Sequence, residues 1–254
     1  MDKKIVLAIS GSLRTPSFTE KMLDLCLEGM GEGIEVYKFY PHKMNVGPCI
    51  GCWSCWDRKK PGICIQNDDF MQILDVYKKA DYFLFALPLY VFGFPATVKN
   101  VIDRFVVALE PAQIKAPGGG TEHPKRFGRN PKTVLISSCG FPEVENFDIL
   151  RMHFRKICEA INWSWSGEIL IPAAGVSNAP KLFDEKYELI RRAGAQLMSG
   201  PISEDLTNRI ATPVMSSDDY RMMATASCEG GFAGGIKTVS IAMKALIQQK
   251  IKKG

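Results

Sequence analysis

The sequence predicts an α/β fold in which a five-stranded parallel sheet lies between two layers of helices, followed by a C-terminal extension. Apolar runs rich in β-branched residues, such as KIVLAIS at residues 4–10, are typical of strands buried on both faces of a parallel sheet. These runs alternate five times with segments of helical periodicity, which is the pattern of a parallel sheet covered by helices. The predicted strands are residues 4–10, 35–40, 81–90, 132–140 and 166–175, and the predicted helices are residues 21–30, 68–80, 96–109, 147–162 and 184–199.

This pattern covers residues 1–200 and predicts one domain there. A polar, Gly- and Pro-rich stretch at residues 111–131 interrupts it and is expected to be an excursion or a mobile loop. Residues 201–254 contain a Met-rich polar stretch at 213–231 and a basic amphipathic helix at 237–253. The extension has too few apolar residues for a core of its own, so we expect it to pack on the same domain or on a partner subunit.

The composition is that of an ordinary globular protein, with 46% hydrophobic and 23% charged residues. The net charge of +5 suits an anionic ligand but does not by itself indicate nucleic acid. No apolar run approaches the roughly 18 residues of a membrane span, and the N-terminus lacks the apolar segment of a signal peptide. We therefore expect a cytoplasmic protein without nucleic-acid or membrane partners, in which the cysteines are thiols or metal ligands.

The loop after the first predicted strand, SGSLRTPSFT at residues 10–19, gathers groups that can bind an anion. These groups are the hydroxyls of Ser10, Ser12, Ser17 and Thr19, the guanidinium of Arg14, and backbone N–H groups at a helix N-terminus. The loop lacks the G-x-G-x-x-G of dinucleotide folds and the lysine of a P-loop, so a monophosphate fits better than a triphosphate. The alternative is a Ser- and Thr-rich helix cap with an exposed arginine.

Two further loops follow the third and fourth predicted strands. The segment PLYVFGFPA at residues 88–96 combines aromatic side chains with a glycine that permits close approach, so it can pack on a planar ring. The segment SSCGFPE at residues 137–143 again places small residues and a glycine where the edge of a ligand could approach the backbone. Ordinary hydrophobic turn packing is the alternative for the aromatic segment.

Taken together, GSLRTPSFTEKML, PLYVFGFPATVKNVIDRF and SSCGFPE resemble the three flavin loops of the flavodoxin-like NAD(P)H-dependent FMN reductases. The cysteine-rich segment PCIGCWSCWDRKKPGICIQNDDF resembles the branch that includes the iron–sulfur flavoproteins. The resemblance spans about residues 1–200 and implies a flavodoxin-like three-layer α/β/α sandwich that binds FMN. Many members of the family have Asn where this chain has Phe18, so the phosphate loop is expected to close differently here.

The resemblance also assigns the loops to parts of FMN. It implies that Ser10, Ser12, Arg14, Ser17, Phe18 and Thr19 hold the phosphate, with Phe18 acting through its backbone N–H. It implies that Pro88, Leu89, Tyr90, Val91, Phe92 and Gly93 line the isoalloxazine, and that Ser138, Cys139 and Gly140 meet the ring or ribityl edge. No protein side chain is assigned a catalytic role, because the flavin carries the chemistry.

Four cysteines lie within sixteen residues of this cysteine-rich segment. Cys49, Cys52 and Cys55 form C-x2-C-x2-C, a spacing that recurs in ferredoxin-type four-iron sites, and Cys64 would be the fourth ligand. The final gap is longer than is usual in iron–sulfur flavoproteins, so a loop of free thiols is an equal alternative. Zinc is less favoured because Cys64 stands alone, and a disulfide is least favoured in a reducing compartment.

The leading functional prediction is an FMN-dependent oxidoreductase that takes hydride from NAD(P)H and passes electrons to a quinone, flavin, nitro compound or metal ion. The alternative is an electron carrier with a [4Fe–4S] cluster on Cys49, Cys52, Cys55 and Cys64, and a third class is a flavin-binding sensor without turnover. The expected partners are a small-molecule or redox-protein electron acceptor and further copies of the chain in a homodimer or homotetramer.

Overall fold

The structure is a computed structural model that describes residues 3–229 and 231–251. Its main sheet has five parallel strands in the order β2-β1-β3-β6-β7. These strands are β1 (Lys4–Ser10), β2 (Ile34–Phe39), β3 (Tyr82–Pro88), β6 (Lys132–Ser138) and β7 (Ser164–Ile171). The predicted flavodoxin-like α/β fold is confirmed, and the sheet order adds that the chain reverses direction across the sheet between β1 and β3.

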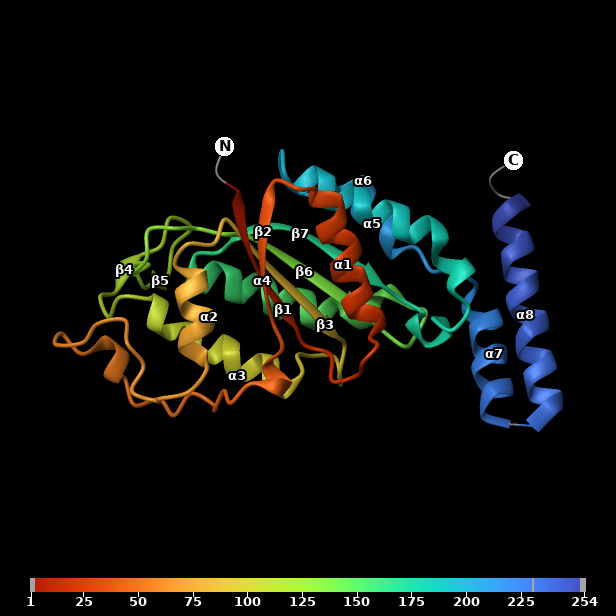
Figure 1. The fold of residues 1–254 in the computed structure, drawn as a ribbon, viewed down its shortest axis with the longest axis horizontal. Helices are drawn as coiled ribbons and strands as arrows, with labels where there is room; N and C mark the ends of the chain where they lie inside the picture. Colours follow the sequence, from red (N-terminus) through yellow and green to blue (C-terminus); the bar gives the residue numbers. More distant parts are fainter. Residues whose placement is uncertain (1–2, 230, 252–254) are drawn as a thin grey trace.

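Helices cover both faces of this sheet (Figure 1). The helices α1 (Phe18–Met30) and α5 (Asp184–Leu197) pack on one face, and α2 (Phe70–Tyr77), α3 (Ala96–Arg104) and α4 (Asp148–Ile161) pack on the other. Two glycines bring α1 and α5 into close contact. A Cβ on Gly194 would lie 2.0 Å from the carbonyl oxygen of Cys26, and one on Gly29 would lie 1.9 Å from that of Arg191.

Several element boundaries differ from the prediction for local reasons. Helix α1 begins three residues earlier than expected because the Ser17 hydroxyl caps it by accepting from the N–H of Glu20. The predicted helix 96–109 ends as an α-helix at Arg104 and continues as a 3₁₀ turn, Phe105–Ala108. The predicted strand 81–90 ends at Pro88, where the chain turns into its aromatic loop.

The excursion at residues 111–131 is attached to the domain. It contains a short antiparallel pair, β4 (Ile114–Lys115) and β5 (Thr121–Glu122). Arg126, near the C-terminal end of the excursion, holds it to the domain by donating to the carbonyl oxygens of Val107 and Leu109 at 3.2 and 3.0 Å. Glu110 pairs with the same guanidinium at 3.2 Å.

The C-terminal extension is helical in the described residues, including most of the Met-rich stretch that the sequence left without a predicted helix. It consists of α6 (Glu204–Ala211), α7 (Ser217–Glu229) and α8 (Gly231–Ile251), and residues 252–253 of the predicted basic helix lie outside the described residues. Leu206 and Ile210 of α6, Tyr220 of α7 and Ile241 of α8 join the same core cluster as α1 and α5. No helix within the described residues is both long and apolar enough to cross a membrane.

Candidate functional site

The three predicted flavin loops leave the sheet at the same edge, because β1, β3 and β6 are parallel neighbours. The strand order reverses between β1 and β3, and open α/β sheets bind ligands at the carboxyl ends of the strands beside such a reversal. Hydrogen bonds join the loops there. The hydroxyls of Thr19 and Ser138 lie 2.6 Å apart, although 119 residues separate them. The N–H of Leu89 donates to the carbonyl oxygen of Ser138 at 2.9 Å.

The first loop presents the N-terminus of α1, whose first-turn N–H groups are the donors that a phosphate accepts. The Ser17 hydroxyl caps the helix, and the Ser12 hydroxyl accepts from the N–H of Arg14 at 3.2 Å. The Arg14 side chain is exposed at this end. The half-buried Phe18 ring packs edge-on against Phe183 with centroids 4.9 Å apart. Ser10 is buried at the end of β1.

The second loop turns on two residues with left-handed backbone. Tyr90 and Gly93 are bridged, with the N–H of Gly93 donating to the carbonyl of Tyr90 at 3.0 Å, and Val91 and Phe92 have φ of 47° and 61°. Such a two-residue turn favours Asn-Gly, and a β-branched residue with positive φ is strained. A Cβ on Gly93 would meet nothing closer than 3.9 Å, so protein packing does not require this glycine.

This strained turn places its side chains outward. Val91 is 95% exposed and Phe92 is 50% exposed, while Pro88 and Leu89 are half-buried against the sheet. Strain of this kind persists where the surrounding structure imposes it, and it is concentrated at ligand sites. The turn leads through Pro95 into α3, which ends at Arg104 beside the cysteine-rich segment.

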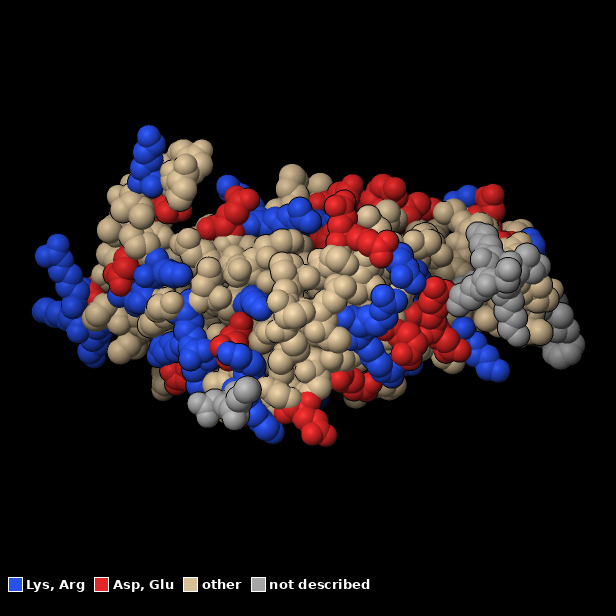
Figure 2. Space-filling view, turned by 90° about the horizontal axis from the view of Figure 1, so that it is seen from above, with Lys and Arg blue, Asp and Glu red and all other residues tan. Residues whose placement is uncertain are grey.

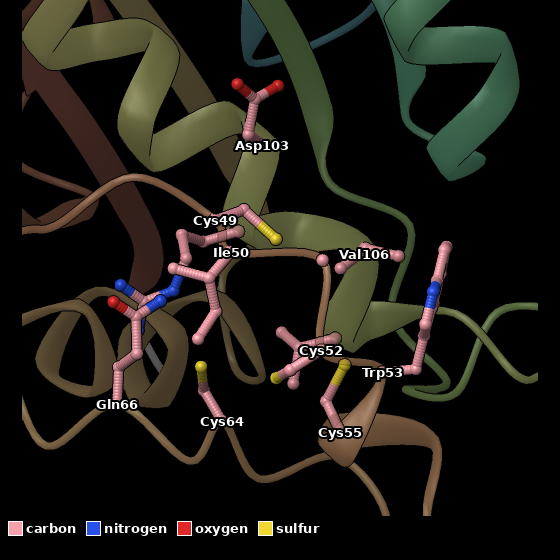
Figure 3. A pocket seen from close by; sticks show the side chains of 12 residues that line it. Cys49, Ile50, Cys52, Trp53, Cys55, Cys64, Gln66, Asp103 and Val106 are labelled. Atoms are coloured by element: carbon pink, nitrogen blue, oxygen red, sulfur yellow. The ribbon is translucent and has the colours of Figure 1, made fainter.

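All four predicted cysteine ligands border one cavity of about 320 Å³ (Figure 3). Figure 3 shows Cys49 on one side of the cavity and Cys52, Cys55 and Cys64 on the other. Ile50, Trp53, Gln66, Arg104 and Val106 complete most of the lining. The cysteines are free thiols, which disfavours the disulfide reading.

The thiols around this cavity differ in their ease of ionisation. Hydrogen bonds from the hydroxyl and N–H of Ser54 lower the pKa of the Cys52 thiol. Burial raises the pKa of the Cys55 thiol, and its neighbour Cys64 raises it further. Thiols that repel one another's charge and face one cavity would all be stabilised as thiolates by a shared cation or cluster.

A buried ion pair joins Asp68 of the cysteine-rich segment to Arg104 at the end of α3. The guanidinium of Arg104 binds both carboxylate oxygens of Asp68 at 2.7 and 3.0 Å and donates to the carbonyl of Gly47 at 3.1 Å. Its Nε is buried without a hydrogen-bond partner among the described residues. The sequence prediction missed this pair, whose members lie 36 residues apart.

The two tryptophans of the segment have different roles. Trp56 anchors it, because its Nε1 donates to the carbonyl of Val106 at 3.1 Å and its ring lies 4.8 Å from that of His123. Trp53, whose ring lies tilted against that of Trp56 with centroids 4.5 Å apart, has left-handed backbone and lines the cavity while remaining 57% exposed. Trp56 therefore fixes the loop, and Trp53 forms part of the wall of the cavity.

Within residues 3–229 and 231–251, no group of three His, Cys, Asp or Glu side chains is placed to hold a metal ion. A four-iron cluster takes one thiolate at each of four separate irons. Four thiols spaced around a common cavity fit this donor set.

Comparisons with known structures agree with the fold. The chain resembles an FMN-dependent NADH-azoreductase from Bacillus anthracis solved in complex with FMN, with a TM-score of 0.58, 15% identity and coverage of 77% of this chain and 99% of that one. It also resembles an NAD(P)H:quinone oxidoreductase from Methanothermobacter marburgensis, with a TM-score of 0.55, 17% identity and coverage of 77% and 97%. At these identities the likeness concerns the fold, which is that of a flavodoxin-like protein.

Sequence comparison points to a family. Residues 5–130, just under half of the chain, match the family described as NADPH-dependent FMN reductase. An iron-sulfur flavoprotein from Methanosarcina thermophila is 32% identical over 103 residues, which are 40% of this chain and 52% of that protein. One from Methanocaldococcus jannaschii is 35% identical over 100 residues, or 39% and 50%. The chain therefore matches about half the length of these curated relatives.

Proposed function

We propose that the protein is an FMN-dependent oxidoreductase that takes hydride from NAD(P)H and passes electrons to a quinone, flavin, nitro compound or metal acceptor. The observation that carries this proposal is the convergence of three loops at the carboxyl ends of β1, β3 and β6, with the N-terminus of α1 beside them. Bound FMN would supply the hydride and electron transfer. The α1 N–H groups and Arg14 would bind its phosphate, and the Tyr90–Gly93 turn would orient its ring.

Replacing Arg14 by alanine should weaken FMN binding roughly tenfold or more, because a charge-assisted contact contributes about 1.5–3 kcal/mol. Titration of FMN fluorescence against the apoprotein measures this change. Arg58→Ala is the matched control, since it removes the same charge from the exposed cysteine-rich segment. Equal affinity of Arg14→Ala and wild type would mean that the phosphate binds elsewhere.

A second function is favoured by the cavity that the four thiols share. We propose as the alternative that a [4Fe–4S] cluster binds there and that the protein carries electrons between a redox partner and FMN. The curated relatives named iron-sulfur flavoproteins support this reading. Arg58, Lys59 and Lys60 are exposed beside the thiols, and Figure 2 shows basic side chains gathered at that end of the molecule. Such a surface would attract a negatively charged redox protein.

Protein purified without air should then contain about four irons and four sulfides per chain, with a broad absorption beneath the flavin bands. Cys55→Ser should lose most of this iron because Cys55 borders the cavity, whereas Cys228→Ser should retain it because Cys228 is exposed on α7. Flavin bands alone, with no iron in the wild type, would support the reductase with a loop of free thiols. The eight free thiols themselves favour a reducing compartment such as the cytoplasm.

We also propose a homodimer or homotetramer. Exposed apolar side chains lie near the proposed flavin site, on the strained turn, on the loop after β6 and on α4: Tyr90, Val91, Phe92, Phe141, Ile149 and Met152. Apolar groups gathered in this way are typical of surfaces that another chain covers. Light scattering should give a mass of at least two 28.2 kDa chains. A monomer with full reductase activity would contradict this assembly.

A further inference from the structure

The C-terminal extension reaches the third predicted flavin loop through Tyr220 of α7. The Tyr220 hydroxyl donates to the carbonyl oxygen of Gly140, and its ring is only 8% exposed. The next residue, Arg221, pairs with Glu143 at 3.5 Å on the far side of the same loop. The loop that the sequence assigns to the flavin edge is therefore held from outside by a segment to which the sequence assigned no function.

The hydroxyl of Tyr220 occupies a slot between two glycines. A Cβ on Gly175 would lie 2.3 Å from the Tyr220 oxygen and 3.4 Å from the carbonyl oxygen of Gly140. Gly175 belongs to the 3₁₀ turn Ala174–Val176 after β7, and its φ is not in the left-handed region. Space for the tyrosine hydroxyl, rather than backbone conformation, requires a glycine at this position.

Helix α7 delivers Tyr220 to this slot in a fixed position. The hydroxyl of Ser216 accepts from the N–H of Asp219 at 3.1 Å and donates to its carboxylate at 2.8 Å. The other carboxylate oxygen of Asp219 pairs with Lys244 of α8 at 3.1 Å. Because Asp219 immediately precedes Tyr220, these contacts restrain the start of α7 and the direction of the tyrosine.

Tyr220 also holds a peptide group that the backbone hydrogen bonds of the loop do not hold. The N–H of Cys139 donates to the carbonyl of Ile171 at the end of β7, and the Cys139 carbonyl accepts from the N–H of Ala174 at 2.8 Å, which holds the Cys139–Gly140 peptide group. The carbonyl of Phe141 accepts from the N–H of Ala173 at 2.7 Å. Between these contacts, the carbonyl of the Gly140–Phe141 peptide group accepts from the Tyr220 hydroxyl.

We propose that the C-terminal extension acts as a latch on the flavin loop, with Tyr220 as a positioning residue that fixes Gly140. Glycine populates many backbone conformations, so without a restraint the Gly140–Phe141 peptide group could rotate and the loop would present its backbone to a ligand in several conformations. With the Gly140 carbonyl held, the loop keeps one conformation in which its backbone can meet the edge of a flavin. The latch rests on the proposed FMN binding, and it gives the extension a role in that site.

Tyr220→Phe tests the latch, since it removes one oxygen and preserves the packing of the ring. Tyr187→Phe is the matched control, because Tyr187 is equally buried in the same core cluster and stacks on Phe183. Hydrogen exchange of the apoprotein should become faster at the amides of Cys139, Ala173 and Ala174, whose hydrogen bonds hold this loop, in Tyr220→Phe only. FMN affinity, measured by fluorescence quenching, should fall about two- to tenfold in Tyr220→Phe and stay unchanged in Tyr187→Phe.

A second variant disturbs the contact between Tyr220 and Gly140 by changing Gly175, which lies against the Tyr220 hydroxyl. Gly175→Ala should also weaken FMN binding, because its new Cβ displaces the Tyr220 hydroxyl. In the Tyr220→Phe background the same alanine should cost much less affinity, since the clashing oxygen is absent. Strictly additive effects of the two substitutions would overturn the latch.

The outcomes separate the latch from the proposed function. Unchanged exchange and unchanged FMN affinity in Tyr220→Phe, with only a lower melting temperature, would reduce Tyr220 to a structural residue. A wild-type protein that does not quench FMN fluorescence would refute FMN binding and with it the role of the latch toward flavin. The exchange measurement needs no FMN and would still report whether Tyr220 restrains the loop.

Discussion

Replacing Asp68 by asparagine is expected to lower the free energy of unfolding by about 3–5 kcal/mol, because it leaves the Arg104 guanidinium charged, buried and without its counterion. The side chains of Arg104 and Asp68 are 1% and 8% exposed. Asp103→Asn is the control, since Asp103 is next to Arg104 in sequence but its pair with Lys99 is exposed and contributes little. Urea denaturation measures both variants.

The double variant Asp68→Leu with Arg104→Met should regain part of the lost stability, because apolar residues of similar volume can replace a buried ion pair. Equal stability of Asp68→Asn and wild type would show that the pair does not hold the cysteine-rich segment. Loss of stability with full retention of iron would show that the pair stabilises the fold without shaping the thiol cavity.

The same pair predicts a pH dependence. Burial alone would raise the pKa of Asp68, but hydrogen bonds from Arg104 and from the N–H groups of Gly47 and Phe70 hold that pKa below its usual value. A carboxyl group with a lowered folded-state pKa contributes stability above its unfolded pKa, and this is lost as the pH falls through the folded pKa. The contribution should therefore be constant near neutrality and disappear below about pH 4, with a flatter acid profile in Asp68→Asn.

The double substitution Val91→Asn with Phe92→Gly should stabilise the protein by about 2 kcal/mol or more while weakening FMN binding. Each non-glycine residue held at positive φ costs about 1–3 kcal/mol, and Asn-Gly adopts this turn readily. The apolar side chains proposed to face the flavin ring would be absent. Melting temperature and FMN titration measure the two effects.

Val91→Ala with Phe92→Ala is the control for this turn. It removes the same side chains but keeps two residues with a Cβ at φ of 47° and 61°, so the strain persists. This variant should lose FMN affinity without the gain in stability. If the Asn-Gly variant is no more stable than the alanine variant, the turn is not strained in solution.

Local sequence patterns predicted the sheet, the helices that cover it and the loops at its carboxyl edge. They did so because burial on both faces leaves continuous apolar runs, as in residues 4–10, and because parallel strands place their ends together. The patterns also selected the four cysteines that border one cavity.

The missed features all depend on contacts between distant parts of the chain. Arg104 meets Asp68 across 36 residues and Tyr220 meets Gly140 across 80, so neither pair leaves a local signature. The conformation of Val91 and Phe92 runs against their own backbone preferences, and a rule based on propensity places such residues in a strand. Gly93 is predicted to permit the close approach of a ring, whereas the left-handed backbone of this turn lies in the two residues before it.

Helix α3 joins the two candidate sites. It begins directly after the strained turn and ends at the arginine beside the thiol cavity, and its nine residues span about 13 Å. A helix of this length is a rigid spacer, so the number of residues in it would set the separation between the proposed flavin ring at one end and the proposed cluster at the other. Electron transfer slows steeply with distance, and each residue inserted into α3 would lengthen the gap by about 1.5 Å. The length of α3 would therefore limit the rate of electron transfer between the two proposed sites.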